Sequence, residues 1–325
     1  MPDYGIRFHE TGGPEVLRYE EIELPPPGRG EARIRITAVG LNFVDTYRRT
    51  GLYPVDLPSA LGAEAVGVVT ELGEGTTGLA VGDRVAHATG PLGAYATAQN
   101  VPADCLVSVP DGVTDESAAA VLLKGLTAWY LLRRTYPVRS GETVVFHAAA
   151  GGVGLIAGQW LRHLGVRAIG TVGSAEKAKV ALENGYREVI LYREDDVAAR
   201  VRELTDGEGV PVVYDSVGAA TFENSLDCLR PRGLMVSFGN ASGPVTGVNL
   251  GILAAKGSLF VTRPTTAHYL NDRDELRAAA AELFDLVERG VTNPNVGQRF
   301  ALADAANAHR ALESRATTGA TVLLP

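Results

Sequence analysis

The glycines of the segment AAAGGVG are the residues of this chain best suited to bind a phosphate. Gly151 and Gly152 would permit a tight turn and a close approach of backbone N–H groups to a pyrophosphate. Val153 follows them, and Gly154 would let a helix pack closely on a strand. Ala148 stands where the common motif has its first glycine. The pattern indicates dinucleotide binding, with the phosphates at the positive end of a helix.

The elements expected around this turn support that prediction. Thr143–His147 is an apolar, β-rich run, and Leu155–Leu164 has the apolar spacing of a helix that Gly165 ends. A second strand is predicted at Ala168–Val172. A strand, glycine turn, helix and strand in this order are typical of a nucleotide-binding unit, whereas a glycine-rich turn by itself also occurs where no ligand binds.

The end of the second predicted strand indicates which dinucleotide is preferred. An acidic residue there would accept hydrogen bonds from the ribose of NAD, but the chain has Gly173 and Ser174, followed by Lys177. A carboxylate would repel a 2′-phosphate and an ammonium would attract it, so NADPH is favoured over NADH. The alternative is that Lys177 is an ordinary solvated helix lysine.

The segment before this unit predicts a β-rich domain, because short apolar runs are separated by glycine and proline. Its expected strands are Ile6–Phe8, Ala32–Val39, Ala65–Leu72, Arg84–Ala88, Gly93–Gln99 and Leu106–Val109. Helical spacing then predicts two helices, at Glu116–Ala120 and Leu126–Arg134.

After the second strand, helices and strands alternate, which is typical of a doubly wound parallel sheet. The expected elements are helices Glu176–Asn184, Asp196–Thr205 and Thr221–Cys228, and strands Glu188–Tyr192, Val210–Ser216, Gly233–Phe238 and Ser258–Thr262. The tail predicts helices at Asp274–Arg289 and Ala303–Glu313 and a strand at Ala320–Leu324 that returns to the first domain.

Composition excludes several other classes of protein. The chain has 325 residues, enough for two domains, and its net charge of −8 argues against nucleic-acid or anionic-membrane partners. The two cysteines, Cys105 and Cys228, cannot form a disulfide framework or a thiolate–zinc cluster. A reducing cytoplasm is therefore expected. Neither a signal peptide nor a membrane span is predicted.

The chain resembles the medium-chain dehydrogenase/reductase superfamily, and within it the zinc-independent quinone oxidoreductase (zeta-crystallin-like) branch. The resemblance rests on VGLNFVDTYRRTGLY, LGAEAVGVV, VGDRVA, LLKGLTAWYLL, AAAGGVG, FGNASG, TRPTTAHY and SRATTGATVLLP, in that order. It implies an α/β fold with a GroES-like β-rich catalytic domain over residues 1–124, a Rossmann doubly wound parallel-sheet NADPH-binding domain over 125–265, and a return to the catalytic domain over 266–325. The active site is expected in the cleft between the domains.

The resemblance also implies a site without a metal. Zinc-dependent relatives have a catalytic cysteine where this chain has Asn42, and a His-Glu pair where it has Ala63 and Glu64. Two of the three protein ligands that a catalytic zinc needs are thus missing. The six histidines show no metal-binding spacing.

The resemblance places Asn42, Asp45 and Tyr47 near the nicotinamide and the substrate, with Tyr53 at the cleft mouth. Asn42 could donate to an oxyanion or orient the cofactor, and the two tyrosines could stack on a flat ring and offer a phenolic O–H. Asn42, Tyr47, Tyr53 and Thr127 are the candidate catalytic residues. Asp45, also a candidate cofactor contact, is expected to be structural rather than a general acid, and local packing is the alternative role for Tyr53.

Further cofactor contacts are implied along the rest of the chain. Lys124, Thr127 and Tyr130 would share one helical face near the nicotinamide ribose and diphosphate, unless they are only a polar stripe. The contacts expected elsewhere are Gly173, Ser174, Lys177, Tyr192 and Arg315 at the adenosine end, with Phe238, Gly239, Asn240, Arg263 and Pro264. Arg263 and Arg315 could instead form interdomain salt bridges.

The leading functional hypothesis is an NADPH:quinone oxidoreductase, with hydride or electron transfer to small quinones. Without a metal to polarise a simple ketone, the acceptor should already be electrophilic. One alternative is an alkenal or enone double-bond reductase, and another is an NADPH-binding protein with little turnover. A homodimer is expected, with the strand Ser258–Thr262 offering an edge for pairing.

Overall fold

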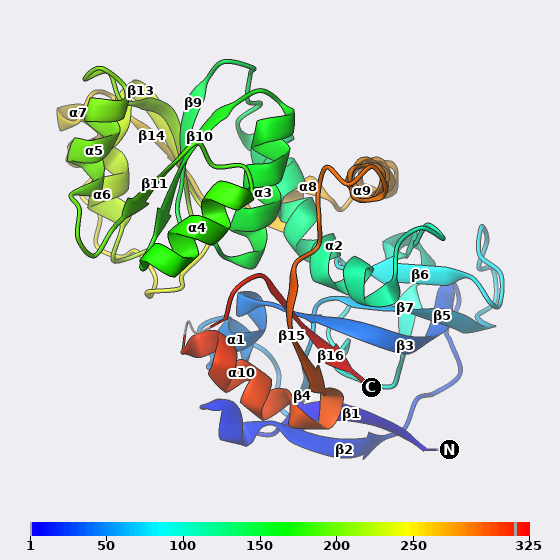
Figure 1. Cartoon of the computed structure of the whole chain (residues 1–325). Coiled ribbons are helices and arrows are strands. Elements are labelled where there is room, and N and C mark those ends of the chain that lie inside the picture. The colour runs from blue at the N-terminus through cyan, green and yellow to red at the C-terminus, as the bar shows by residue number, and fades with distance from the viewer. Residues whose placement is uncertain (1, 315–316) are drawn as a thin grey trace. The chain divides into compact units, whose positions relative to one another are not determined.

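A computed structural model describes residues 2–314 and 317–325 (Figure 1). The chain forms two compact units. The first contains the chain up to residue 126 together with residues 270 onward, and the second contains residues 127–269. In the described residues, no helix has both the length and the apolar character needed to cross a membrane.

The first unit is built on a seven-stranded sheet whose long central strand is β3 (Glu31–Leu41). Apolar side chains alternate along β3, and Ile34 and Ile36 enter a core shared with Phe8 and Leu323. The sheet contains β15 (Val296–Ala301), β16 (Ala320–Leu324), β3, β5 (Ala65–Leu72), β6 (Arg84–His87), β8 (Val107–Ser108) and β7 (Ala98–Pro102). A smaller sheet has β2 (Arg18–Ile22), β1 (Asp3–Phe8) and β4 (Ser59–Ala60).

The C-terminal segment completes this first sheet. Strand β16 pairs antiparallel with β3, with Val322 opposite Gly40, so the end of the chain joins a strand formed near its beginning. The last strand therefore belongs to the same compact unit as the first strands of the chain. The helical segments of this unit are α1 (Phe43–Arg49), most of α2 (Asp115–Tyr130), α9 (Arg273–Glu288) and α10 (Ala305–Glu313), with short turns at Pro14–Val16, Ala103–Cys105 and Leu302–Asp304.

The second unit is a six-stranded parallel sheet in the order β11-β10-β9-β12-β13-β14. Its strands are β9 (Thr143–Phe146), β10 (Arg167–Val172), β11 (Glu188–Leu191), β12 (Val210–Asp215), β13 (Leu229–Ser237) and β14 (Phe260–Thr262). The strand order reverses at β9, as in a Rossmann fold, so the predicted fold class is confirmed.

Helices cover both faces of this parallel sheet (Figure 1). Those that follow β9 and β10 pack on one face, and those that follow β11 and β12 pack on the other. The helices are α3 (Gly152–His163), α4 (Ala175–Glu183), α5 (Val197–Leu204), α6 (Phe222–Asp227), α7 (Gly251–Ala255) and α8 (Thr266–Tyr269), with a π-helical turn at Leu131–Thr135. The carboxyl ends of the strands thus meet at one edge, where such sheets bind ligands.

Several elements differ from those predicted. The two helices expected at Glu116–Ala120 and Leu126–Arg134 are one helix, α2, that passes into the π-helical turn, because Leu122, Leu123 and Lys124 between them are good helix formers and outweigh the single Gly125. The strand expected at Gly93–Gln99 is wrong in its first part, since Gly93 has φ +121° and regular pairing begins only at Ala98. Helix α1 was missed altogether.

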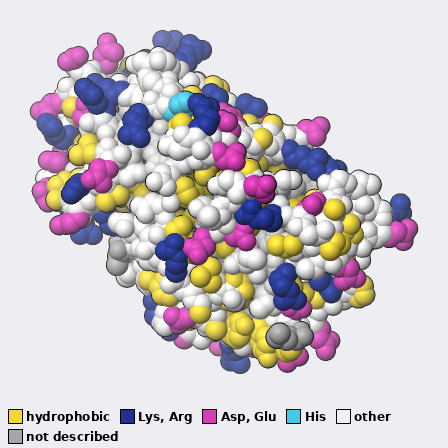
Figure 2. Space-filling view, turned by 45° about the vertical axis from the view of Figure 1, so that its right-hand side comes forward, with side chains coloured by type: hydrophobic (Ala, Val, Ile, Leu, Met, Phe, Trp, Pro, Cys, Tyr) yellow, Lys and Arg dark blue, Asp and Glu magenta, His cyan; other side chains and the backbone are white. Residues whose placement is uncertain are grey.

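Charged side chains of both signs lie on one face of the molecule. On the face that Figure 2 shows, lysine and arginine side chains are interspersed with aspartate and glutamate rather than gathered by sign. Mixed charge of this kind favours solubility.

Candidate functional site

Asn42 lies between β3 and α1, and its neighbours fix its place. Its backbone is extended, with φ −134° and ψ 152°, as is usual for the residue that precedes a helix. The carboxylate of Asp45, three residues into the turn, accepts a hydrogen bond from Asn42 N at 3.0 Å. A side chain that reaches back to the helix start in this way stabilises the first turn, so the local sequence itself positions Asn42.

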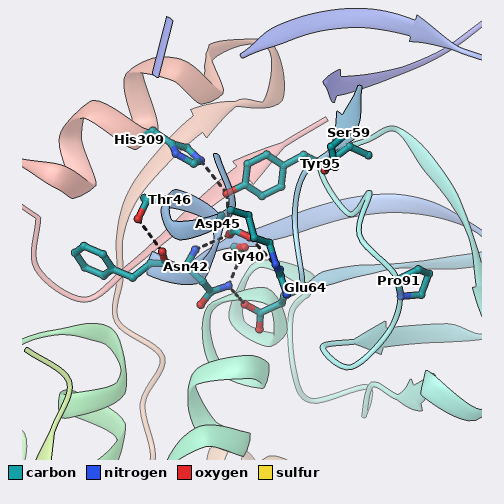
Figure 3. Close-up of polar contacts among 12 residues, drawn as sticks. Gly40, Asn42, Asp45, Thr46, Ser59, Glu64, Pro91, Tyr95 and His309 are labelled. Atoms are coloured by element: carbon teal, nitrogen blue, oxygen red, sulfur yellow. Dashed lines mark hydrogen bonds and ion pairs between the residues drawn. The ribbon is translucent and has the colours of Figure 1, made fainter. Parts of the chain in front are cut away.

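The side-chain amide of Asn42 is fully used as a donor. Its Nδ2 donates to Gly40 O at 3.1 Å and to Glu64 Oε2 at 2.9 Å (Figure 3). Both partners are acceptors only, so the orientation of the amide is determined and Oδ1 is the atom left to interact with a ligand. Of the two roles considered for Asn42, this geometry supports orienting a ligand that carries a donor and opposes donation to an oxyanion.

Glu64 joins Asn42 to helix α2. The Glu64 carboxylate is completely buried, and Oε1 accepts a hydrogen bond from Leu123 N at 2.6 Å. Its Oε2 lies 3.5 Å from Lys124 Nζ. A Cβ at Gly40 would overlap both Glu64 Oε2 and Ala119 O, so only glycine fits beside this carboxylate. Sequence reasoning did not assign Glu64 a role, although a carboxylate inside the apolar segment LGAEAVGVV was a signal.

Asp45 belongs to a second buried group that joins α1 to α10. Tyr95 Oη donates to Asp45 Oδ2 at 3.0 Å and lies 3.3 Å from His309 Nε2 (Figure 3). Arg49 Nη1 is 2.9 Å from His309 Nδ1, and Arg49 also forms an ion pair with Glu313 at 2.6 Å. Because arginine only donates, His309 Nδ1 must accept, which leaves the ring proton on Nε2.

Burial shifts the pKa values within this group in opposite directions. Removal from water raises the pKa of Asp45 to about 6 and lowers that of His309 to about 3, where the Arg49 charge acts in the same direction. The position of Asp45, buried with partners from its own unit, agrees with the structural role expected for it. Its assignment as a cofactor contact stays a prediction.

The two candidate tyrosines lie together. The rings of Tyr47 and Tyr53 are 5.3 Å apart in an edge-to-face arrangement, and Tyr53 N donates to Tyr47 O at 2.9 Å. Phe43, which was not predicted, lies 6.4 Å from Tyr47 and is exposed, and both tyrosines are partly exposed. This aromatic group can both pack locally and present flat rings to a ligand.

The glycine turn after β9 forms as predicted. Gly151 N donates to Ala148 O at 2.9 Å, and Gly151 immediately precedes α3. A Cβ at Gly154 would overlap Ala148 O, so the close approach of helix and turn requires glycine there. Ala148 adopts φ +54°, a left-handed conformation that the usual first glycine would take without strain. The turn and the N-terminus of α3, with Gly152 and Val153, therefore fit a bound diphosphate.

The residues expected at the adenosine end also lie together. A Cβ at Gly173 would be only 2.7 Å from Tyr192 Oη, so glycine lets the tyrosine cross the end of β10. Ser174 precedes α4, and its Oγ accepts a hydrogen bond from Lys177 N at 3.4 Å. The predicted contact Arg315 lies outside the described residues.

One carboxylate near these residues was missed. Glu176 follows Ser174 at the start of α4, and hydrogen bonds to its own backbone N–H and to Ser174 hold its pKa below the usual range. Its negative charge opposes a 2′-phosphate, whereas Lys177 attracts one.

A third cluster connects the end of α2 to α8. Tyr130 is hydrogen-bonded to Thr127 and Thr266, and burial raises its pKa to about 12. Its ring stacks on Tyr269 at 4.9 Å. The structure thus brings Thr127 and Tyr130 together, as their spacing predicted, while Lys124 instead pairs with Glu64.

Arg263 and the end of β13 meet beside this cluster. Arg263 Nη1 donates to Gly239 O at 3.2 Å, and Asn240 Oδ1 accepts from Arg263 Nη2 at 3.0 Å while Asn240 Nδ2 donates to Gly239 O. Phe238 packs on Phe146, with ring centres 5.7 Å apart. Pro264 follows Arg263 between β14 and α8. Arg263 therefore has partners within its own unit.

Comparisons with known proteins agree with this architecture. Residues 28–111 match the model of the alcohol dehydrogenase GroES-like domain, and residues 152–284 match that of the zinc-binding dehydrogenases. A quinone oxidoreductase of Pseudomonas aeruginosa is 59% identical over 98% of this chain and 99% of its own length. The chain belongs to the quinone oxidoreductase branch of the medium-chain dehydrogenase/reductase superfamily. The predicted family is confirmed.

Two further relatives extend the comparison within this branch. The crystal structure of Escherichia coli quinone oxidoreductase complexed with NADPH superimposes with a TM-score of 0.98, at 53% identity over 99% of this chain and 100% of that one. A 2-haloacrylate reductase of a Burkholderia species is 45% identical over 98% of each chain. As a member of this branch, the chain is an oxidoreductase.

The residues of this branch member do not fit the zinc of the wider family. Asn42 and Ala63 offer no thiolate or imidazole at the two positions where zinc-dependent relatives have ligands. Over residues 2–314 and 317–325, no three His, Cys, Asp or Glu side chains gather to form a possible metal site. No step of the chemistry is therefore assigned to zinc.

Proposed function

We propose that this chain is an NADPH-dependent quinone oxidoreductase that reduces small quinones without a metal. The observation that carries the proposal is the full-length similarity to quinone oxidoreductases, including one crystallised with NADPH. Lys177 supports the choice of NADPH, because its ammonium stands three residues after Ser174 and can offset the opposing charge of Glu176.

The second unit binds the cofactor and the first unit binds the acceptor in this proposal. The turn around Gly151 and Gly154 takes the diphosphate on backbone N–H groups, and the cluster of Tyr130, Arg263 and Asn240 orients the nicotinamide end. When bound, NADPH supplies the hydride. Asn42 Oδ1 accepts a hydrogen bond from the cofactor, and the aromatic group of Tyr47 and Tyr53 holds the flat quinone ring.

A second candidate function is the reduction of a conjugated carbon–carbon double bond. The relative named 2-haloacrylate reductase, at 45% identity, favours this possibility because 2-haloacrylate is a conjugated alkene. The same hydride donor would serve either acceptor, so the preference depends on the groups that line the acceptor site.

Steady-state oxidation of NADPH and NADH by chelator-treated protein tests both functions. The acceptors are benzoquinone, a naphthoquinone and an alkenal. Fast oxidation of NADPH by the quinones is the expected result. Turnover with the alkenal alone would favour the double-bond reductase, and tight NADPH binding without turnover on any acceptor would contradict both enzymatic functions.

The cofactor preference is tested at Lys177. Lys177→Ala removes the ammonium proposed to meet the 2′-phosphate and is expected to raise the dissociation constant of NADPH about tenfold, with little change for NADH. Lys179→Ala, which removes an exposed lysine of the same helix, is the matched control. Equal losses for NADPH and NADH would remove Lys177 from the 2′-phosphate site.

A cytoplasmic homodimer formed at β14 completes the proposal. Strand β14 is the edge of the parallel sheet, and Phe260 and Val261 on it are 60% and 40% exposed. An exposed, apolar edge strand is a ready site for pairing with a second copy. Sedimentation at micromolar concentration is expected to give a dimer, which Val261→Lys weakens; a wild-type monomer would contradict the assignment.

A further inference from the structure

Lys124 is a buried cation with donors to spare. The residue is 6% exposed, and within the described part of the chain its Nζ contacts one acceptor, Glu64 Oε2, at 3.5 Å. An ammonium carries three N–H donors. Two of them therefore have no partner among the residues that the structure describes. Burying such a group is costly unless something else accepts these donors.

Glu64 cannot satisfy this ammonium alone. Its Oε1 is 2.6 Å from Leu123 N, and its Oε2 is closer to Asn42 Nδ2, at 2.9 Å, than to Lys124 Nζ, at 3.5 Å. The carboxylate is thus shared among three donors. Glu64 attracts the ammonium of Lys124 electrostatically at 3.5 Å, and the remaining N–H groups of Lys124 are available to a ligand.

Asn42 cannot supply the donor that a developing oxyanion needs. Both of its amide N–H groups are directed at protein acceptors, Gly40 O and Glu64 Oε2. The same carboxylate therefore sets two complementary groups side by side: Asn42, which presents an acceptor, and Lys124, which presents donors and a positive charge.

We propose that Lys124 is a catalytic residue that donates to a carbonyl oxygen of the quinone, and that Glu64 is its positioning residue. This inference rests on the proposed function and moves Lys124 from the cofactor diphosphate to the acceptor. In the overall reaction, quinone, NADPH and one proton give hydroquinone and NADP⁺. Bound NADPH would supply the hydride from the C–H bond of its dihydronicotinamide, which breaks as the bond to the quinone forms. The displaced π electron pair of the quinone moves onto a carbonyl oxygen, and that oxygen takes a proton from Lys124 Nζ. The lysine regains its proton from solvent.

The test compares Lys124→Met, which removes the charge, with Lys124→Arg, which keeps it. With NADPH saturating and benzoquinone as acceptor, Lys124→Met is expected to lower kcat about 100-fold, the loss typical of removing one oxyanion donor. Lys124→Arg is expected to retain an intermediate kcat. Lys179→Met, on the surface of α4, is the control. Thermal unfolding of each variant identifies any that fails to fold. If Lys124→Met does not fold, the kcat of Lys124→Arg, which keeps a positive charge beside Glu64, is compared with that of wild type.

A second readout separates a catalytic from a structural role. A methyl-substituted benzoquinone places more negative charge on oxygen during reduction than a chloro-substituted one, so it needs the donor more. Lys124→Met is therefore expected to lower kcat more for the methyl-substituted acceptor, whereas a merely structural loss would affect both equally. Glu64→Gln removes the negative charge that positions Lys124. It is also expected to lower kcat more for the methyl-substituted quinone than for the chloro-substituted one, by a smaller factor than Lys124→Met.

Three outcomes would overturn the inference. Equal kcat losses for the two quinones would make Lys124 structural. An unchanged kcat of Lys124→Met with a raised NADPH dissociation constant would show that Lys124 binds the cofactor and not the quinone. Wild-type activity in Lys124→Met would exclude any role, while an inactive wild-type protein would instead contradict the proposed function itself.

Discussion

The two units bury an aspartate in opposite ways. Asp215, at the end of β12, accepts four hydrogen bonds, from the backbone N–H groups of Val217 and Gly218 and the hydroxyls of Thr221 and Ser225. Asp45, in the first unit, accepts from one backbone N–H and one hydroxyl. Within the described chain, Asp45 Oδ1 accepts no hydrogen bond, and Arg48 Nη1 lies 3.9 Å from it.

The difference lies in where the donors come from. All four donors to Asp215 belong to the ten residues that follow it, so the charge is satisfied by a local turn and the start of α6. Ser225 then contacts His147 Nε2 at 2.9 Å, and His147 Nδ1 contacts Thr171 Oγ1 at 2.8 Å. This neutral relay lies directly before the glycine turn and holds it in place.

The group around Asp45 depends on distant partners and on charge. Arg49 on α1 reaches His309 and Glu313 on α10, which are 260 and 264 residues away in the chain. Asp45 and His309 in this group can gain or lose a proton in an accessible pH range, whereas the hydroxyls of Thr221 and Ser225 beside Asp215 cannot. We therefore expect the stability of the second unit's network to depend mainly on its hydrogen bonds to Asp215, and that of the first unit's network to depend on the protonation of Asp45 and His309.

Asp215→Ala is expected to have the largest effect on stability. It leaves two buried and two part-buried donors without their acceptor, and each unsatisfied buried group costs about 1–3 kcal/mol, partly relieved by water, so we expect a loss of roughly 3–5 kcal/mol in the free energy of unfolding. Denaturant unfolding measures the loss, and NADPH affinity should fall with it. Asp195→Ala, at an exposed aspartate, is the control. A loss no larger than that of the control would refute the role given to this network.

Asp45→Asn is expected to change the pH dependence of stability. The pKa of Asp45 is raised from 3.8 to about 6, so the folded state binds this proton more tightly than the unfolded chain. Its contribution is fully present below pH 3.8 and is lost as the pH rises through about 6. The stability of wild type relative to Asp45→Asn should therefore fall by up to roughly 3 kcal/mol between these limits.

In both wild type and Asp45→Asn, His309 makes the stability rise with pH, which is opposite to the effect of Asp45. The pKa of His309 is lowered from 6.5 to about 3, so its contribution to stability is lost as the pH falls through that range. Only the difference between wild type and Asp45→Asn isolates Asp45. Asp56→Asn, at an exposed aspartate, should show no such change. A difference between wild type and Asp45→Asn that stays constant with pH would contradict the assignment.

Ala148→Gly is expected to have the smallest effect, and to stabilise. The left-handed conformation of Ala148, at φ +54°, costs alanine roughly 1–2 kcal/mol, while the extra freedom of glycine in the unfolded chain costs about 0.5–1 kcal/mol. The net gain should be about 0.5–1 kcal/mol by thermal or denaturant unfolding. Ala150→Gly, in the same turn without a positive φ, should destabilise instead. Destabilisation by both substitutions would show that Ala148 is not strained.

Local signals in the sequence were enough for much of the architecture and for the turn and the helical face that carry several candidate site residues. The glycine turn, the alternation of strands and helices, and the spacing of Thr127 and Tyr130 were predicted from a few neighbouring residues each. Turn chemistry and side-chain periodicity act over such short distances, which is why they can be read without the fold. Strand β14 shows the limit, since Ser258, at φ +55°, shortens its predicted start.

Roles that depend on partners from distant segments were decided by the tertiary structure. The spacing of Lys124 with Thr127 predicted a shared helical face, and the resemblance implied a cofactor contact there. The fold in addition pairs Lys124 with Glu64, 60 residues away in the chain, and turns both amide hydrogens of Asn42 toward the protein. Residue type told what each side chain could donate or accept. Which of those capacities remain for a ligand depends on which partners the folded chain brings within hydrogen-bond distance, and that is a property of tertiary packing.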